Sequence, residues 1–299
     1  MEFRSHTFTC NHQTIHAEIA GKQDARTILM LHGFPEFWRA WAGVAEHLAD
    51  DYQIVLPDQR GYNLSDKPTS IQAYHTKHLV ADMAELISHV SPDNPVILCG
   101  HDWGASVAYL LAMRHPDKIS HLIIANGVHP VCFQKALFAS GKQTVASQYI
   151  THLRQPDSED RLSADHYAGL LDMFRSLSAA PWLKSEDIEA YLQAWSGENC
   201  LSGMINWYRA SPLVVPEPDT PAQPYEITEE MRERYRISMP HLLIWGCEDK
   251  ALLPEAYEHL PLFAEHLEIN RIGNASHWIL HEEPGQVAKK IDGFVNSQT

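Results

Sequence analysis

Short apolar segments of strand length alternate with amphipathic segments at both ends of the chain. Helix-like stretches at 75–90 and 105–116 separate the earlier apolar segments, and another at 286–295 closes the chain. A strand–helix–strand alternation builds a parallel sheet covered by helices. We therefore predict an α/β fold whose buried strands are ILMLH (28–32), QIVL (53–56), PVILC (95–99), HLIIAN (121–126), HLLIWG (241–246) and LEINRI (267–272).

The middle of the chain has a different pattern. Helical periodicity dominates at 166–178, 185–196 and 200–210, and no segment between 130 and 236 has the character of a buried strand. Five prolines in 211–225 rule out helix and central strand there, so this stretch is expected to be an extended connection. A helical insertion in an α/β core indicates a cap domain. The predicted organisation is core 1–129, helical cap 130–236 and core 237–299.

Charge and composition exclude several classes of function. The formal net charge of −15 opposes binding to nucleic acid or to anionic membranes. The first residues lack the apolar segment of a signal peptide, and no apolar stretch is long enough to span a bilayer. Five widely spaced cysteines indicate free thiols in a reducing compartment. We therefore expect a cytoplasmic protein, and without an HExxH motif or a Cys/His cluster we expect no metal.

The sequence GHDWG at 100–104 indicates a nucleophile at the end of a strand. An apolar strand, a Gly-x-x-x-Gly frame and a helix together predict the tight elbow that exposes a nucleophile at the carboxyl edge of the sheet. The central residue is usually serine, but here it is Asp102. A carboxylate is already ionised at neutral pH and suits attack on an alkyl-type carbon, which forms an ester. The alternative for Asp102 is an ordinary helix N-cap.

An ester intermediate needs hydrogen-bond donors for the oxyanion that forms during its hydrolysis. The backbone N–H groups of Trp103, after the nucleophile, and of Phe34, in the loop after an earlier strand, are the expected donors. Pro35 has no N–H and can only stiffen that loop.

A general base and the acid that orients it follow two later strands. Asp249 comes after HLLIWG and His277 comes after LEINRI, which gives the order nucleophile, acid, histidine. His277 is expected to take a proton from water, and Asp249 to hold its tautomer. Glu248 is the alternative acid, because it is adjacent to Asp249.

These motifs together resemble the epoxide hydrolases of the α/β-hydrolase superfamily. The resemblance spans nearly the whole chain and includes HGFPE (32–36), DQRGYNLSDKP (58–68), GHDWGA (100–105), NWYR (206–209) and the final ED…SHW. It implies a mostly parallel eight-stranded sheet with a cap, a nucleophile–acid–histidine triad and no cofactor. Its substrate would be a small, hydrophobic epoxide, and the protein would be a monomer or a homodimer.

The resemblance also implies two cap tyrosines that protonate the opening epoxide ring. Tyr208 stands inside NWYR, which matches the second cap tyrosine of the family. Tyr149 lies seven residues before Pro156, which resembles the spacing of the first cap tyrosine of the family. The expected substrate contacts are Phe34, Pro35, Trp103 and Trp278. Further cap residues that could shape the pocket are Phe133, Phe138, Met173, Trp182, Trp195 and Met204, and the alternative tyrosines are Tyr167, Tyr191 and Tyr235.

Two other functions fit parts of this pattern. Dehalogenases share GHDWG, but Phe34 replaces the Asn or Glu of haloalkane dehalogenases, and Trp103-Gly104-Ala105-Ser106 replaces the Arg-Gly-Gly-Arg of fluoroacetate dehalogenases. Asn126 follows the strand after which some relatives carry the triad acid, and an amide cannot balance an imidazolium. A non-catalytic small-molecule receptor is the third interpretation, because fold does not determine function.

Overall fold

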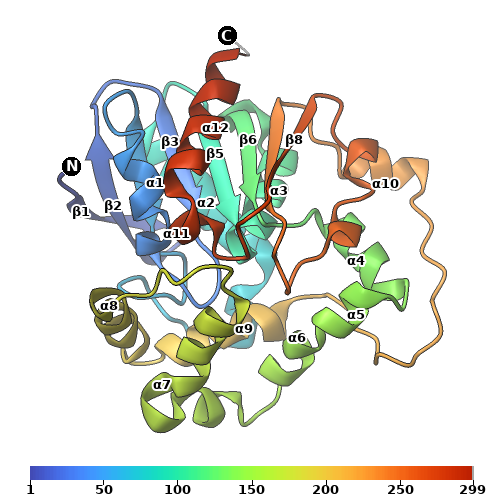
Figure 1. The fold of residues 1–299 in the computed structure, drawn as a ribbon. Helices are drawn as coiled ribbons and strands as arrows, with labels where there is room; N and C mark the ends of the chain where they lie inside the picture. Colours follow the sequence, from blue (N-terminus) through green and yellow to red (C-terminus); the bar gives the residue numbers. More distant parts are fainter. Residues whose placement is uncertain (298–299) are drawn as a thin grey trace.

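The computed structural model describes residues 1–297, and an eight-stranded sheet runs through its centre (Figure 1). The strand order is β1-β2-β4-β3-β5-β6-β7-β8, antiparallel at β1/β2 and β2/β4 and parallel elsewhere. The strands are β1 (Arg4–Cys10), β2 (Gln13–Gly21), β3 (Thr27–Leu31), β4 (Gln53–Pro57), β5 (Val96–His101), β6 (Ile119–Ala125), β7 (His241–Gly246) and β8 (Leu267–Ile272). The predicted α/β fold with a mostly parallel sheet is confirmed.

The first two strands were not identified from the sequence. They form a hairpin whose turn, Asn11 and His12, has the positive φ angles 50° and 63°. Most of β1 is exposed, so its side chains carry no continuous apolar run of the kind that marks a buried strand. The six apolar segments of the sequence correspond to β3 through β8.

Alternate residues of the central strands pack against helices on the two faces of the sheet. Leu29 and Leu31 of β3 belong to the core under α2 and α3, whereas Ile28 and Met30 belong to the core under α1 and α12. The helices are α1 (Ala42–Glu46), α2 (Thr76–Val90), α3 (Trp103–Arg114), α4 (Pro130–Phe138), α5 (Lys142–Ala146), α6 (Gln148–Leu153), α7 (Ser158–Leu177), α8 (Ser185–Trp195), α9 (Cys200–Ala210), α10 (Glu229–Arg234), α11 (Ile279–Glu282) and α12 (Pro284–Ser297). Within residues 1–297, no helix combines the length and the apolar character required to cross a membrane.

The helices α4 to α9 lie between β6 and β7 in the chain, and α6 to α9 cover the end of the sheet where the parallel strands finish (Figure 1). Two indole groups tie this insertion to the core. The Trp195 Nε1–H donates to the Pro35 carbonyl oxygen at 2.6 Å, and the Trp207 Nε1–H donates to the Arg60 carbonyl oxygen at 2.9 Å. Both bonds are buried, so they hold α8 and α9 against the loops that follow β3 and β4.

Helix α7 is interrupted between Ala164 and Tyr167, where three consecutive residues have positive φ angles. The proline-rich stretch that follows α9 contains neither helix nor strand, as expected. These features leave the insertion helical but irregular.

We expect Gly104→Ala to destabilise the fold, because a Cβ atom at this position would lie 2.2 Å from the Leu31 carbonyl oxygen of β3. Overpacking of this kind costs about 1–3 kcal/mol of unfolding free energy. The matched control is Gly293→Ala in α12, where a Cβ atom would meet nothing within 4 Å. This substitution should stabilise the helix by about 0.5–1 kcal/mol. Urea unfolding of both variants measures the difference, and an unchanged Gly104→Ala midpoint would contradict the predicted packing.

Candidate active site

Asp102 occupies the tight elbow between β5 and α3. Its φ and ψ angles of 49° and −120° are unusual for a residue with a side chain, and such strain is characteristic of functional sites. The N-terminus of the twelve-residue α3 lies directly behind it, where the helix dipole favours negative charge. The elbow thus places the Asp102 side chain at the carboxyl edge of the sheet.

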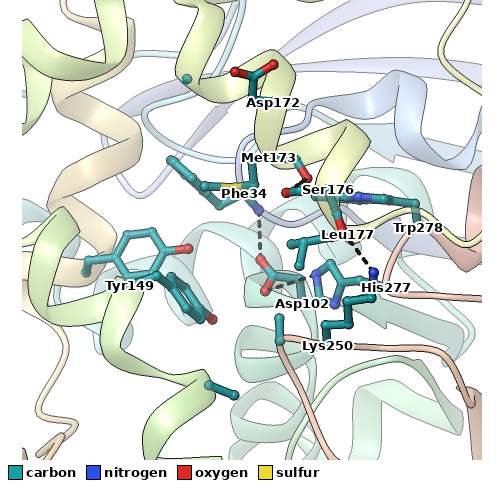
Figure 2. Close-up of a pocket in the computed structure, with 14 residues that line it drawn as sticks. Phe34, Asp102, Tyr149, Asp172, Met173, Ser176, Leu177, Lys250, His277 and Trp278 are labelled. Carbon is teal, nitrogen blue, oxygen red and sulfur yellow. Dashed lines mark hydrogen bonds and ion pairs between the residues drawn. The ribbon is translucent and has the colours of Figure 1, made fainter.

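The loop after β3 supplies a backbone donor to this carboxylate. The Phe34 N–H donates to Asp102 Oδ1 at 2.8 Å (Figure 2). Gly33 permits this approach, because a Cβ atom there would lie 2.3 Å from the Asp102 Cβ atom. Trp103 is the first residue of α3, so its N–H has no partner within that helix.

His277 and Asp249 form a buried pair beside Asp102. The His277 Nδ1 atom lies 2.8 Å from Asp249 Oδ2, and its Nε2 atom lies 3.7 Å from Asp102 Oδ2. The other Asp249 oxygen accepts from the backbone N–H groups of Ala251 and Leu252 at 2.8 and 2.9 Å. Glu248, the alternative acid, is exposed to solvent, whereas Asp249 is buried against the imidazole.

Asn126 orients the acid. Its Nδ2–H donates to Asp249 Oδ2 at 2.7 Å, and its Oδ1 atom accepts from the Gly246 N–H at 2.7 Å. From the sequence alone, Asn126 was expected only to be an amide in the place of an acid at the end of β6. The structure shows that the amide bridges two strand ends and supports the acid that follows β7.

A second buried carboxylate lies behind His277 and was not identified from the sequence. Glu36 Oε1 is 2.6 Å from His281 Nε2 and accepts from the Tyr191 hydroxyl at 3.0 Å. Its other oxygen lies 3.3 Å from Nδ1 of His101, whose Nε2–H donates to the His277 carbonyl oxygen at 2.8 Å. Burial alone would raise the pKa of Glu36, but the two histidines hold it well below its usual range. No pattern within HGFPE indicated these distant partners.

A cavity of about 450 Å³ connects the tyrosines with Asp102 and His277 (Figure 2). The Tyr149 and Tyr208 rings meet edge to face, with their centroids 6.3 Å apart. The cavity is lined by Phe34, Asp102, Ala146, Tyr149, Gly169, Asp172, Met173, Ser176, Leu177, Tyr208, Lys250, Ala251, His277 and Trp278. Each of the two tyrosines therefore shares a wall with Asp102.

The remaining expected contacts are distributed around this cavity. Trp103 lines a smaller adjoining hollow together with Asp102, both tyrosines and Phe133. Pro35 is buried and is not among the lining residues, because its carbonyl faces the Trp195 indole instead. The alternative tyrosines also lie outside the cavity wall, and Tyr191 bonds Glu36.

Burial and charge set the protonation states of the site. Burial alone would lower the pKa of His277, but the hydrogen bond and charge of Asp249 and the charge of Asp102 raise it to about 9. Burial raises the pKa of Tyr149 and of Tyr208 well above the usual 10, and the charge of Asp102 adds to both shifts. These shifts favour neutral phenols and a positively charged His277 imidazole near neutral pH. Among residues 1–297, no group of three or more His, Cys, Asp and Glu side chains could hold a metal ion.

We expect the pKa of His277 to fall in Asp102→Asn, because the substitution removes one of the negative charges that favour the imidazolium. Histidine ring NMR across a pH titration measures this pKa, with His277→Gln used to assign the signal. A wild-type midpoint near 6.5 that Asp102→Asn leaves unchanged would contradict this electrostatic description.

The chain is similar to known proteins in both sequence and fold. Residues 26–284 match the sequence profile of the α/β hydrolase fold family. The chain is 34% identical over 95% of both sequences to the AB hydrolase superfamily protein YfhM of Bacillus subtilis. It is 32% identical to epoxide hydrolase 2 of Caenorhabditis elegans, over 93% of this chain and 76% of that protein.

Two solved structures are similar over almost the full length. An epoxide hydrolase from a hot-environment metagenome superposes with a TM-score of 0.88 at 33% identity, covering 99% of both chains. The epoxide hydrolase of Bacillus megaterium superposes with a TM-score of 0.82 at 28% identity, covering 97% of this chain and 100% of that one. The chain therefore belongs to the α/β-hydrolase superfamily and, within it, to the family of the epoxide hydrolases.

Proposed function

We propose that this protein hydrolyses an epoxide to a vicinal diol through a covalent ester on Asp102. The observation that carries this proposal is the cavity in which the phenols of Tyr149 and Tyr208 share a wall with the Asp102 carboxylate. An opening epoxide needs a nucleophile at carbon and a proton donor at oxygen. The cavity supplies both, and its apolar lining suits a hydrophobic substrate.

In the first step, a carboxylate oxygen of Asp102 attacks an epoxide carbon and forms a C–O bond. The ring C–O bond breaks, and its electron pair passes to the epoxide oxygen. Tyr149 and Tyr208 hydrogen-bond this oxygen, and one of them gives it a proton and is later reprotonated from water. A neutral phenol is a suitable donor because the alkoxide is far more basic than a phenolate.

In the second step, water attacks the carboxyl carbon of the Asp102 ester. His277 takes a proton from this water, while Asp249 stabilises the imidazolium that forms. The N–H groups of Phe34 and Trp103 hold the tetrahedral oxyanion, and loss of one such donor costs about 3 kcal/mol of activation free energy. Collapse breaks the alkyl ester bond and releases the diol, whose oxygen receives the proton from His277. The second proton of the water remains on the Asp102 carboxyl group and then passes to the neutral imidazole, which restores the carboxylate and the imidazolium of the free enzyme.

Alkylation itself prepares the base for the second step. The negative charge of Asp102 is one of the charges that raise the pKa of His277. Esterification removes that charge, so the pKa of His277 falls and the imidazole more readily becomes neutral. The base therefore becomes available when the ester exists.

We further propose that 130–236 acts as the cap domain, because Tyr149 and Tyr208 come from it while Asp102, Asp249 and His277 come from the core segments 1–129 and 237–299. A reducing, cytoplasmic location is supported by five free cysteines, four of them buried. The dehalogenase alternative is disfavoured by the phenols, since a departing halide needs no proton.

We expect His277→Gln to form the ester but not to hydrolyse it. Incubation with a panel of aryl and alkyl epoxides should add one whole epoxide mass to the intact protein, and the further change Asp102→Asn should abolish the adduct. An adduct formed only from halogenated compounds, short by one hydrogen halide, would contradict the proposed function and indicate a dehalogenase.

We expect Tyr149→Phe and Tyr208→Phe each to slow ester formation by about tenfold or more, and the double variant by about 10²- to 10⁴-fold, because the proton donors to the epoxide oxygen are lost. Single-turnover kinetics measures this rate. The matched control is Tyr167→Phe, which alters a tyrosine of the same insertion that bonds the Trp195 carbonyl oxygen instead. Equal rates in all of these variants would exclude the phenols as the acid.

A further inference from the structure

Tyr149 and Tyr208 come from two separate helices, so their edge-to-face ring contact requires those helices to keep a fixed relation. Helix α9, which carries Tyr208, is anchored to the core by the Trp207 indole and by close packing of Gly203 on Gly61. Helix α6, which carries Tyr149, has only six residues. A helix this short has little stability of its own and depends on its contacts.

Arg154 connects these two helices directly. It is the first residue after α6, and its Nε–H donates to the carbonyl oxygen of Tyr208 itself at 2.9 Å. A second guanidinium N–H donates to the Ser211 carbonyl oxygen at 3.2 Å, just beyond the end of α9. The side chain that follows the Tyr149 helix thus bonds the backbone of the second tyrosine.

Physical chemistry favours a guanidinium at this place. The last carbonyl groups of a helix lack partners within it, and the helix dipole attracts positive charge there. The fork of N–H groups can bond two carbonyls at once, which sets an orientation as well as a distance. Arg154 is half-buried, so water competes only partly for these carbonyls.

We propose that Arg154 is a positioning residue for epoxide ring opening, which holds the Tyr149 and Tyr208 hydroxyls toward one point by fixing α6 against α9. This inference rests on the proposed function and specifies which step the residue serves. Ester hydrolysis uses His277, Asp249 and the oxyanion donors, none of which Arg154 touches. Its loss should therefore slow ester formation and leave ester hydrolysis unchanged.

The test compares Arg154→Met with the wild type in rapid-quench single turnovers on styrene oxide. Ester is measured by intact mass and diol by chromatography. We expect the rate of ester formation to fall by about 10- to 100-fold, because small misplacements of catalytic groups slow reactions by this much. The rate of ester hydrolysis should stay within about twofold of the wild-type rate. Arg154→Lys, which keeps the charge and can bond one carbonyl, should recover part of the loss. If Arg154→Met does not fold, Arg154→Lys provides the test, and its rate of ester formation should then lie below that of the wild type.

The matched control is Glu159→Gln. This change weakens the Arg209–Glu159 ion pair, which joins the residue after Tyr208 to α7. It leaves both carbonyl acceptors of Arg154 intact. It should lower the melting temperature without changing the ratio of the two rates. The inference is overturned if Arg154→Met slows both steps equally, slows neither, or behaves as Glu159→Gln does.

Parallel measurements on the tyrosine variants separate this inference from the proposed function. If Tyr149→Phe and Tyr208→Phe slow ester formation but Arg154→Met does not, only the role of Arg154 fails. If His277→Gln forms no ester with any epoxide and the wild type forms no diol, the proposed function fails and the inference fails with it.

Discussion

The burial of negative charge around one imidazole is the constraint on which this site depends. Asp102, Asp249 and Glu36 all lie near His277, and a buried carboxylate without partners costs several kcal/mol. Each carboxylate is compensated differently. Asp102 has a backbone N–H and a helix N-terminus, Asp249 has the imidazole, two backbone N–H groups and an amide, and Glu36 has two histidines and a phenol. The carboxyl ends of parallel strands bring these groups together.

This compensation supports the proposal that an aspartate takes the place of a serine nucleophile. A serine requires a base to activate it, whereas a carboxylate can attack without one. In the proposed mechanism, His277 can therefore remain protonated in the free enzyme and act only after the ester has formed. The phenols from the insertion would supply the proton that the opening ring needs, so each proposed step uses a different part of the molecule.

The sequence predicted the parts of the structure that depend on local patterns. The buried strands β3 to β8 have continuous apolar runs, and the Asp102 elbow has its own glycine frame. Asp249 and His277 follow two such strands, so topology places them together. The hairpin β1–β2 was missed because β1 is mostly exposed and the polar residues His16 and Glu18 interrupt the buried part of β2, and Pro35 was expected at the substrate but faces Trp195. The supporting roles of Glu36, Asn126 and Arg154 depend on partners far away in the chain, which no local pattern indicates.

The central claim is that the substrate bonds covalently to Asp102, and oxygen labelling tests it most directly. A single turnover is run in water enriched in ¹⁸O with enzyme in excess over epoxide, followed by mass analysis of the diol and of the peptide that contains Asp102. Water attacks the ester at the carboxyl carbon in this account, so the diol should carry unlabelled oxygen from the protein and Asp102 should gain ¹⁸O. A labelled diol from the first turnover, with Asp102 unlabelled, would show direct addition of water and contradict the account.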